Sequence, residues 1–162
     1  MDEKLLAALN RQIGVELGAE ATYKSARYWA DAAGWKGLSK WSKRAHKSEH
    51  DDAAEIMDAI VDSGEFPSIP AVAAPESKFT GLADVLNYAA ELEVTNLGNI
   101  QALHDLAVKV GDVVVTVFLE GMLIEQRESV TETAKWAKKG QAAGTDPAAL
   151  ELLDRKLGRG KV

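Results

Sequence analysis

The stretch RAHKSEHDD, residues 44–52, places a dense run of charged and imidazole side chains inside an Ala-rich segment. The apolar residues on either side of it, from Leu38 to Ile60, recur at the spacing of an amphipathic helix. Glu49 and Asp52 are three residues apart, so a helix would present both carboxylates on one face. The stretch therefore predicts a long helix with a pair of acidic side chains near its middle.

The spacing of four polar residues predicts how this helix packs against other helices of the chain. Glu49 lies 33 residues after Glu16, and Gln126 lies 33 residues after Glu93. Two helical hairpins of equal span would each bring such a pair to the same height. If the hairpins pack together, four polar side chains from four helices meet at one level of a bundle. Carboxylate-bridged two-iron centres in helix bundles have this geometry.

The composition favours one all-α domain, which we expect to span residues 1–162. Single cores commonly form in chains of about 100 to 200 residues, and here 46% of the residues are hydrophobic and four are proline. The net charge of −6 argues against a nucleic-acid partner, because such partners usually require a basic face. Without cysteine, any metal site must use oxygen and imidazole ligands. Since neither a signal peptide nor a membrane span is indicated, we expect a cytoplasmic protein.

Helical periodicity and glycine breaks predict four long helices and a short fifth one. Gly34, Gly64, Gly111 and Gly140 each follow an apolar pattern, at the position where helices commonly end. Residues 145–147 (TDP) are typical of a capped start with proline in the first turn. The expected helices span about residues 2–32, 36–63, 82–110, 113–139 and 146–157.

Residues 64–81 are predicted to form a long crossover between the second and third helices. This segment contains three of the four prolines and has no helical periodicity. The third and fourth helices, in contrast, are joined by a short turn at Gly111. The predicted architecture is therefore a four-helix bundle with one long crossover and a short fifth C-terminal helix.

Glu16 and Glu93 are expected to be buried carboxylates, because each is flanked by leucine within an apolar pattern. A buried carboxylate without a partner is costly, so it needs a cation or a proton. Together with Glu49 and Asp52, they would carry four negative charges, which two Fe²⁺ would balance. A lone acidic residue on a helix is usually solvated. It is the joint pattern of level, spacing and crossover that favours a metal centre.

Several segments along the chain share a pattern with one known family. They are residues 9–17 (LNRQIGVEL), Glu49, residues 62–64 (DSG), residues 92–93 (LE), residues 103–107 (LHDLA) and residues 118–126 (FLEGMLIEQ). Taken together, they make the chain resemble a bacterial non-haem ferritin over nearly its whole length. This resemblance implies a five-helix, ferritin-like subunit, a homo-oligomeric cage of 24 copies, and iron storage. It also implies a ferroxidase that oxidises Fe²⁺ with O₂ or H₂O₂.

The resemblance also implies roles for individual residues. Glu16 would bind the first iron, Glu49 would bridge the two irons, and Glu93 would bind the second. Gln126 would lie close to the second iron as a ligand or catalytic group. Tyr23 falls on the family's conserved tyrosine and would assist catalysis. No haem is expected.

One departure from the family concerns the second-helix motif Glu-x-x-His. Here the motif is Glu49-His50-Asp51-Asp52, so an aspartate stands where the histidine ligand belongs. Aspartate can bind iron, but it is shorter and adds a negative charge, which should favour Fe³⁺ and change the rate. His46, one turn before Glu49, is a candidate to compensate.

A second departure concerns a third iron site. Ser48 and Ser129 stand where many bacterial members carry further carboxylates. Glu125 and Glu128, with His46, would form what remains of an additional iron site.

Two other functions are compatible with part of this pattern. A slow or non-catalytic shell subunit would enclose mineral without oxidising iron rapidly. A Dps-like mini-ferritin would bind iron between subunits and shield DNA. Ligands on all four helices, a fifth helix and the lack of a lysine-rich tail favour the ferritin interpretation over the second of these.

Overall fold

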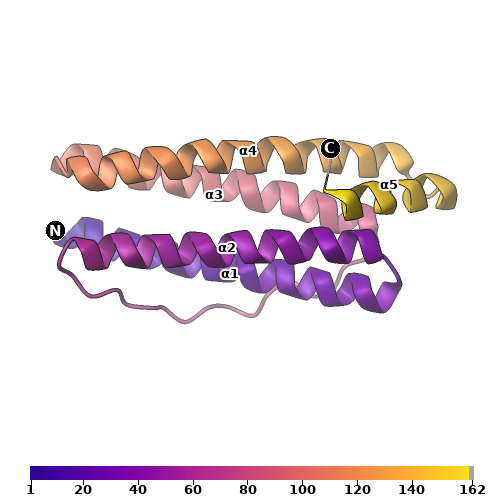
Figure 1. Cartoon of the computed structure of the whole chain (residues 1–162), viewed down its shortest axis with the longest axis horizontal. Helices are drawn as coiled ribbons and strands as arrows, with labels where there is room; N and C mark the ends of the chain where they lie inside the picture. Colours follow the sequence, from indigo (N-terminus) through magenta and orange to yellow (C-terminus); the bar gives the residue numbers. More distant parts are fainter. Residues whose placement is uncertain (161–162) are drawn as a thin grey trace.

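The computed structural model describes residues 1–160, and within them the chain forms five α-helices and no strand. The helices are α1 (Glu3–Ala33), α2 (Lys36–Asp62), α3 (Leu82–Val110), α4 (Val113–Ala143) and α5 (Pro147–Arg159). Two antiparallel hairpins, α1–α2 and α3–α4, lie side by side, and α5 lies at one end of the bundle (Figure 1). The predicted all-α bundle with a long crossover and a short fifth helix is confirmed. Residues 161 and 162 of the predicted domain lie outside the described residues.

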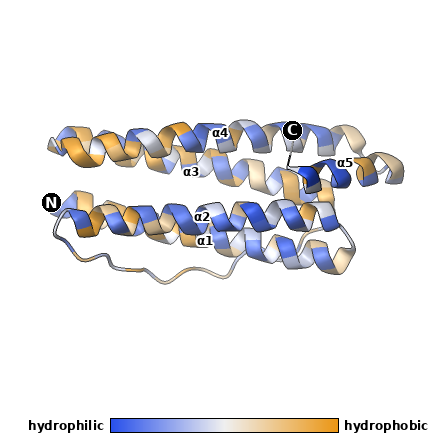
Figure 2. Cartoon of the chain, in the orientation of Figure 1, coloured by the Kyte–Doolittle hydropathy of each residue, from blue (hydrophilic) through white to orange (hydrophobic). Residues whose placement is uncertain are grey.

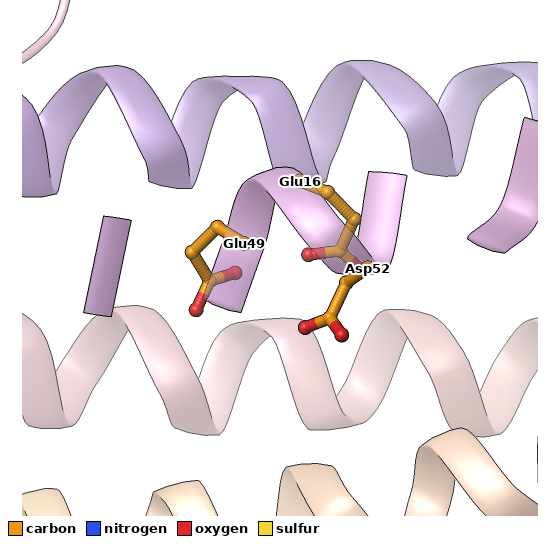
Figure 3. Close-up of side chains that lie close together, drawn as sticks. All are labelled: Glu16, Glu49 and Asp52. Carbon is orange, nitrogen blue, oxygen red and sulfur yellow. The ribbon is translucent and has the colours of Figure 1, made fainter. Parts of the chain in front are cut away.

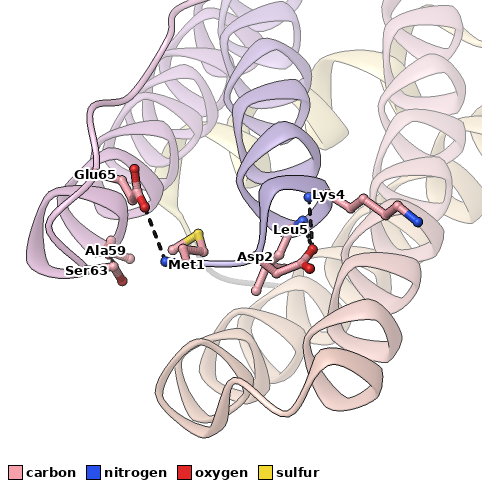
Figure 4. Close-up of polar contacts among 7 residues, drawn as sticks. All are labelled: Met1, Asp2, Lys4, Leu5, Ala59, Ser63 and Glu65. Atoms are coloured by element: carbon pink, nitrogen blue, oxygen red, sulfur yellow. Dashed lines mark hydrogen bonds and ion pairs between the residues drawn. The ribbon is translucent and has the colours of Figure 1, made fainter.

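Local sequence signals account for both ends of α1. The Asp2 carboxylate accepts hydrogen bonds from the backbone nitrogens of Lys4 at 2.9 Å and Leu5 at 3.1 Å (Figure 4). At the other end, Gly34 adopts a φ of 86°, a conformation that glycine adopts without steric cost. The amino group of Met1 contacts Glu65 Oε1 at 3.2 Å, which ties the start of α1 to the end of α2 (Figure 4).

The end of α4 differs from the prediction. The helix was expected to stop at residue 139 because glycine follows there, but it continues to Ala143. Gly140 is buried inside the helix, and a Cβ at this position would lie 3.2 Å from the Cα of Ala83 on α3. This glycine therefore permits close helix packing, and the helix ends at Gly144 instead.

The short helix α5 is joined to α2 by its acidic side chain Asp154. Trp35 provides no side-chain cap for α2. Asp154 accepts hydrogen bonds from the backbone nitrogens of Gly37 at 2.9 Å and Leu38 at 2.8 Å. A helix that is distant in sequence thus caps the first turn of α2.

The crossover, residues 64–81, runs along the α1–α2 hairpin (Figure 1). Its backbone at Ser68 donates to Asn10 Oδ1 at 2.8 Å. Pro70 packs so closely on Gly14 that a Cβ there would lie 2.6 Å from the proline ring. In residues 1–160, no helix combines the length and the apolar character required to cross a membrane.

The part of the chain that the structure describes contains two separate apolar clusters. One surrounds Leu38, Leu86 and Trp136 at the α5 end of the bundle. The other surrounds Leu9 and Ile100 at the opposite end. The buried polar residues described next belong to neither cluster.

Candidate metal centre

Each of the four long helices contributes one buried polar side chain at the predicted level. The residues are Glu16 on α1, Glu49 on α2, Glu93 on α3 and Gln126 on α4, and they are 0%, 5%, 3% and 5% exposed. Because ionisable side chains are rarely buried without partners, three buried glutamates in one chain of this size require an explanation.

Three carboxylates approach one another between α1 and α2. Glu16, Glu49 and Asp52 each offer an oxygen, and these oxygens all lie within 4.8 Å of one another (Figure 3). Glu16 and Glu49 are buried, whereas Asp52 is half-buried. The oxygens are close enough for one cation to bind all three side chains, and hard cations prefer such oxygen ligands.

Glu93 lies outside this trio and is held by two hydrogen-bond donors. Gln126 Nε2 donates to Glu93 Oε2 at 2.7 Å and to the Glu93 carbonyl oxygen at 3.0 Å. The Tyr23 hydroxyl donates to Glu93 Oε1. Both oxygens of Glu93 are therefore fixed in orientation before any cation binds.

Two residues that the sequence interpretation did not include support Glu16. Gln12 Nε2 donates to Glu16 Oε1 at 2.7 Å, and Asn96 Nδ2 donates to Glu16 Oε2 at 2.9 Å. Gln12 and Asn96 also bind each other at 2.7 Å, and Asn96 contacts Gln126 Oε1 at 3.3 Å. This network links three helices. Its signal in the sequence is the helical spacing of Gln12 four residues before Glu16 and of Asn96 three residues after Glu93.

Burial favours the protonated, neutral forms of the carboxylic acids in this cluster. It raises the pKa of Glu16 and of Glu93, although their hydrogen-bond donors oppose the rise. The pKa of Glu49 rises well above its usual value through burial and the charges of Glu93 and Glu16. The pKa of Asp52 rises to about 7, first through burial and then through neighbouring acids, Glu16 foremost.

Glu49 is the least satisfied member of the cluster. Its Oε2 atom is buried and has no hydrogen-bond partner. A buried acceptor without a partner costs free energy unless a cation or proton supplies one. A divalent cation would satisfy this oxygen and compensate the repulsion among the neighbouring carboxylates.

Tyr23 connects the centre to an aromatic side chain on α2. Its ring meets that of Trp41 edge to face, with centroids 5.7 Å apart. Burial, followed by the charges of Glu93 and Glu49, raises the pKa of Tyr23 well above its usual value. The hydroxyl therefore stays protonated at neutral pH and remains a donor to Glu93.

The residues expected to form an additional iron site are not brought together as one group. Within residues 1–160, only Glu16, Glu49 and Asp52 form a set of three or more acidic or histidine side chains whose ligand atoms all lie within 4.8 Å of one another. Glu125 and Glu128 are exposed on α4, and Glu125 lies near enough to Asp52 to help raise its pKa.

His46 lies against α1. Both of its ring nitrogens are buried without a partner, and burial, followed by Lys24 and Arg27, lowers its pKa. His50 is exposed and contacts Glu20 at 3.3 Å.

A pocket of about 270 Å³ reaches the centre from the side of α2 and α4. Tyr23, Glu49 and Glu93 line it, and the exposed residues Arg44 and Ser48 stand at its edge. Solvent can therefore approach a cluster whose three glutamates are almost fully buried.

Comparison with known protein families and sequences identifies the relatives of this chain. The family profile described as a ferritin-like domain matches residues 6–143. A bacterial non-heme ferritin of Staphylococcus saprophyticus is 28% identical over 159 residues, which cover 97% of this chain and 94% of the relative. A bacterial non-heme ferritin of Bacteroides fragilis is 25% identical over 159 residues, which cover 98% of this chain and 99% of the relative.

Solved structures give the same result. An open pore ferritin from the hyperthermophilic archaeon Archaeoglobus fulgidus matches with a TM-score of 0.94 at 28% identity, over 98% of each chain. A form of the A. fulgidus ferritin that was engineered to be closed matches with a TM-score of 0.94 at 29% identity, over 98% of this chain and 96% of the other. The match extends over almost all of both chains.

Proposed function

The chain belongs to the ferritin family, and we propose that it oxidises Fe²⁺ at a two-iron centre and stores the ferric product inside a cage of its own copies. Family membership and structural similarity support iron storage. The observation that carries the oxidase proposal is the buried carboxylate cluster, in which Glu16, Glu49 and Asp52 present oxygens within 4.8 Å of one another.

The contacts suggest a division of the cluster into two iron sites. Glu16 and Asp52 would bind the first Fe²⁺, and Glu93 would bind the second, with Gln126 beside it. Glu49 would bridge the two, since its unpartnered oxygen belongs to the side chain whose pKa responds to both Glu16 and Glu93. The iron that these carboxylates would bind is also the substrate that the centre would oxidise.

The proposed reaction has a simple balance. Two Fe²⁺ each lose one electron, and O₂ takes up both electrons and two protons to give two Fe³⁺ and H₂O₂. When H₂O₂ is the oxidant, the same two electrons and two protons yield two water molecules. The carboxylic acids of the cluster release protons as Fe²⁺ binds, because a bound cation favours their charged forms. Tyr23 keeps Glu93 oriented through this change.

We propose that Asp52 is an iron ligand, and that its presence in place of histidine does not disable the centre. It belongs to the trio, beside Glu16 (Figure 3), and with Glu93 its carboxylate brings the acidic residues of the proposed centre to four. Four carboxylates match the charge of two Fe²⁺, so binding removes the cost of burying them. The additional charge should favour Fe³⁺ and slow its release.

Exposed valines near the start of α4 support the proposed oligomeric cage. Val113, Val114 and Val117 on α4 are 71%, 77% and 61% exposed. Figure 2 shows apolar residues gathered at this end of α3 and α4. Contiguous exposed apolar side chains mark protein interfaces, and a second copy of the chain is the partner that the family suggests. Native mass spectrometry would test the proposed 24 copies.

The decisive experiment is an aerobic Fe²⁺ titration of the metal-free protein, with the fast oxidation phase followed by absorbance. A break near two irons per chain is expected. The complete absence of a fast phase would contradict the oxidase proposal and favour the alternative, a slow or non-catalytic shell subunit in which the cluster serves to bind or nucleate mineral.

A further inference from the structure

Glu132 on α4 is an exposed carboxylate at the edge of the 270 Å³ pocket. Its Oε1 accepts hydrogen bonds from the indole nitrogen of Trp41 at 3.3 Å and from that of Trp136 at 3.2 Å. Trp41 is on α2 and Trp136 is on α4, and both rings are buried. The two indoles therefore hold this surface carboxylate in one place across the gap between the helices.

Glu132 is also electrostatically coupled to the centre. Its charge contributes to the raised pKa of Tyr23 and, after burial, to that of Glu93. Glu132, Glu49 and Glu93 all line the same pocket, so carboxylates stand at its mouth and at its floor. Glu49, at the floor, has the buried oxygen that lacks a partner.

The rest of the pocket suits a hydrated cation. Ser48, Ser129 and Thr133 provide hydroxyl groups along its wall. Among the described residues that line the pocket, Arg44 is the one cationic side chain. It donates through Nη2 to the carbonyl oxygen of Leu157 at 2.7 Å, which directs it toward α5. The volume exceeds by several times the roughly 30 Å³ that one water occupies in the liquid.

We infer that the pocket is the path by which divalent cations reach the centre from the α2–α4 face, and that Glu132 is a cation-binding residue at its mouth. This inference rests on the proposed two-iron function. A passing Fe²⁺ binds Glu132 with its water shell largely intact and then moves to Glu49 and Glu93. No electron is transferred at Glu132.

A purely structural role makes a different prediction. If Glu132 serves only as acceptor for two indole N–H groups, a neutral glutamine serves equally well, because its amide oxygen accepts the same bonds. Glu132→Gln therefore removes the charge and retains the acceptor. Glu91→Gln is the matched control, since Glu91 is exposed on α3 and does not line the pocket.

The first measurement is Co²⁺ binding to the metal-free, full-length protein by calorimetry, together with quenching of tryptophan fluorescence. Co²⁺ is a divalent probe that O₂ does not oxidise under these conditions. We expect one fewer Co²⁺ per chain in Glu132→Gln than in the parent, with loss of the quenching that this ion causes at Trp41 and Trp136. Glu91→Gln should match the parent.

The second measurement is the rate of Fe²⁺ oxidation against Fe²⁺ concentration. Glu132→Gln should raise the half-saturating concentration about tenfold, the lower end of typical electrostatic focusing effects, and leave the maximal rate unchanged. The difference from the parent should shrink at high salt. Unchanged Co²⁺ stoichiometry and quenching in Glu132→Gln would overturn the inference.

A second variant tests the inference if Glu132→Gln does not fold. Ser129→Leu fills the pocket and leaves Glu132 with its indole partners. It too should lose the additional Co²⁺, and retention of that ion would overturn the inference.

The cation site at Glu132 and the proposed iron oxidation can each fail without the other. A parent that binds Co²⁺ at Glu132 but never oxidises iron rapidly would contradict the oxidase and support the cation site, whereas fast oxidation with an unaffected Glu132→Gln would do the reverse.

Discussion

The acidic pair on α2 and the Glu93 site between α3 and α4 contribute to the same centre in different ways. On α2, Glu49 and Asp52 crowd against Glu16, and one oxygen of Glu49 has no partner. On the other side, both oxygens of Glu93 accept hydrogen bonds, from Tyr23 and Gln126. The α2 pair therefore stores unfavourable electrostatic energy that a cation relieves. The Glu93 site is preorganised, and its geometry depends on neutral donors.

Charge repulsion therefore dominates on α2, whereas Glu93 is oriented by neutral donors from α1 and α4. Removing a member of the α2 pair should change cation binding itself, whereas removing a donor to Glu93 should leave a cation bound in a less favourable arrangement.

The largest effect is expected for Glu49→Ala, which removes the proposed bridging ligand. The rate of fast Fe²⁺ oxidation should fall by more than the roughly 10–100-fold that is typical for loss of a supporting group. Stopped-flow absorbance would measure this rate. Circular dichroism should show an intact fold, because a buried carboxylate without a partner does not stabilise the metal-free protein. A variant that oxidises iron at the parent rate would refute the two-iron assignment.

A smaller effect is expected for Tyr23→Phe, which removes one donor from Glu93 and keeps the ring against Trp41. Oxidation should slow roughly 10–100-fold while the number of irons bound per chain stays the same. Tyr88→Phe is the control, because Tyr88 packs on Phe79 away from the carboxylates. Equal rates for the two variants would show that the hydroxyl of Tyr23 does not position Glu93.

Asp52→His should have a still smaller effect on the rate. Imidazole is also a good iron ligand, so activity should remain within about tenfold of the parent. The variant should bind Fe³⁺ less tightly, since the centre then has one negative charge fewer. Equilibrium iron binding and the oxidation rate would be measured together. A folded but inactive protein would mean that the aspartate binds in a geometry that histidine cannot reproduce.

The smallest effect concerns the pH dependence of stability in the metal-free protein. Burial raises the pKa of Asp52 from 3.8 to about 7, so the native state binds more protons than the unfolded chain between these values. This contribution to stability is complete below about pH 4 and is lost as the pH rises through about 7. The melting temperature should fall across this window, by on the order of 5 °C.

Asp52→Asn provides the control for this pH dependence, because asparagine does not titrate and the slope should become shallower. Zn²⁺ should restore the melting temperature more at pH 7.5 than at pH 5.5, since protons compete with the cation for the carboxylates. A parent protein whose metal-free stability rises with pH would contradict the description of Asp52 as a group that burial holds protonated.

Much of the fold was predictable because it depends on short-range patterns. Apolar periodicity determined which segments are helical, Gly34 and Gly111 marked the breaks, and three prolines marked the crossover. The equal spacing within the two hairpins sufficed to place Gln126 beside Glu93, since two residues equidistant from a turn face each other. In the structure the two are joined by a hydrogen bond.

Other features depended on contacts that no local pattern encodes. Gly140 is the residue type that commonly follows the end of a helix. In the structure it lies inside α4, where the close approach of Ala83 on α3 requires a small residue. Asp154 caps α2 from 116 residues away. The donors to Glu16, Gln12 and Asn96, are ordinary polar residues until the helices bring them together.

The sequence by itself therefore determined the helices, their order and the acidic residues available to a cation, because these follow from periodicity, turn chemistry and spacing along one chain. The tertiary structure alone decided which oxygens converge, which are already hydrogen-bonded and which remain unpartnered. Those properties arise from distances between helices, and they set the pKa of each carboxylate through burial and neighbouring charge. They also revealed Glu132, whose position depends on two indoles that only the packed bundle brings to one oxygen.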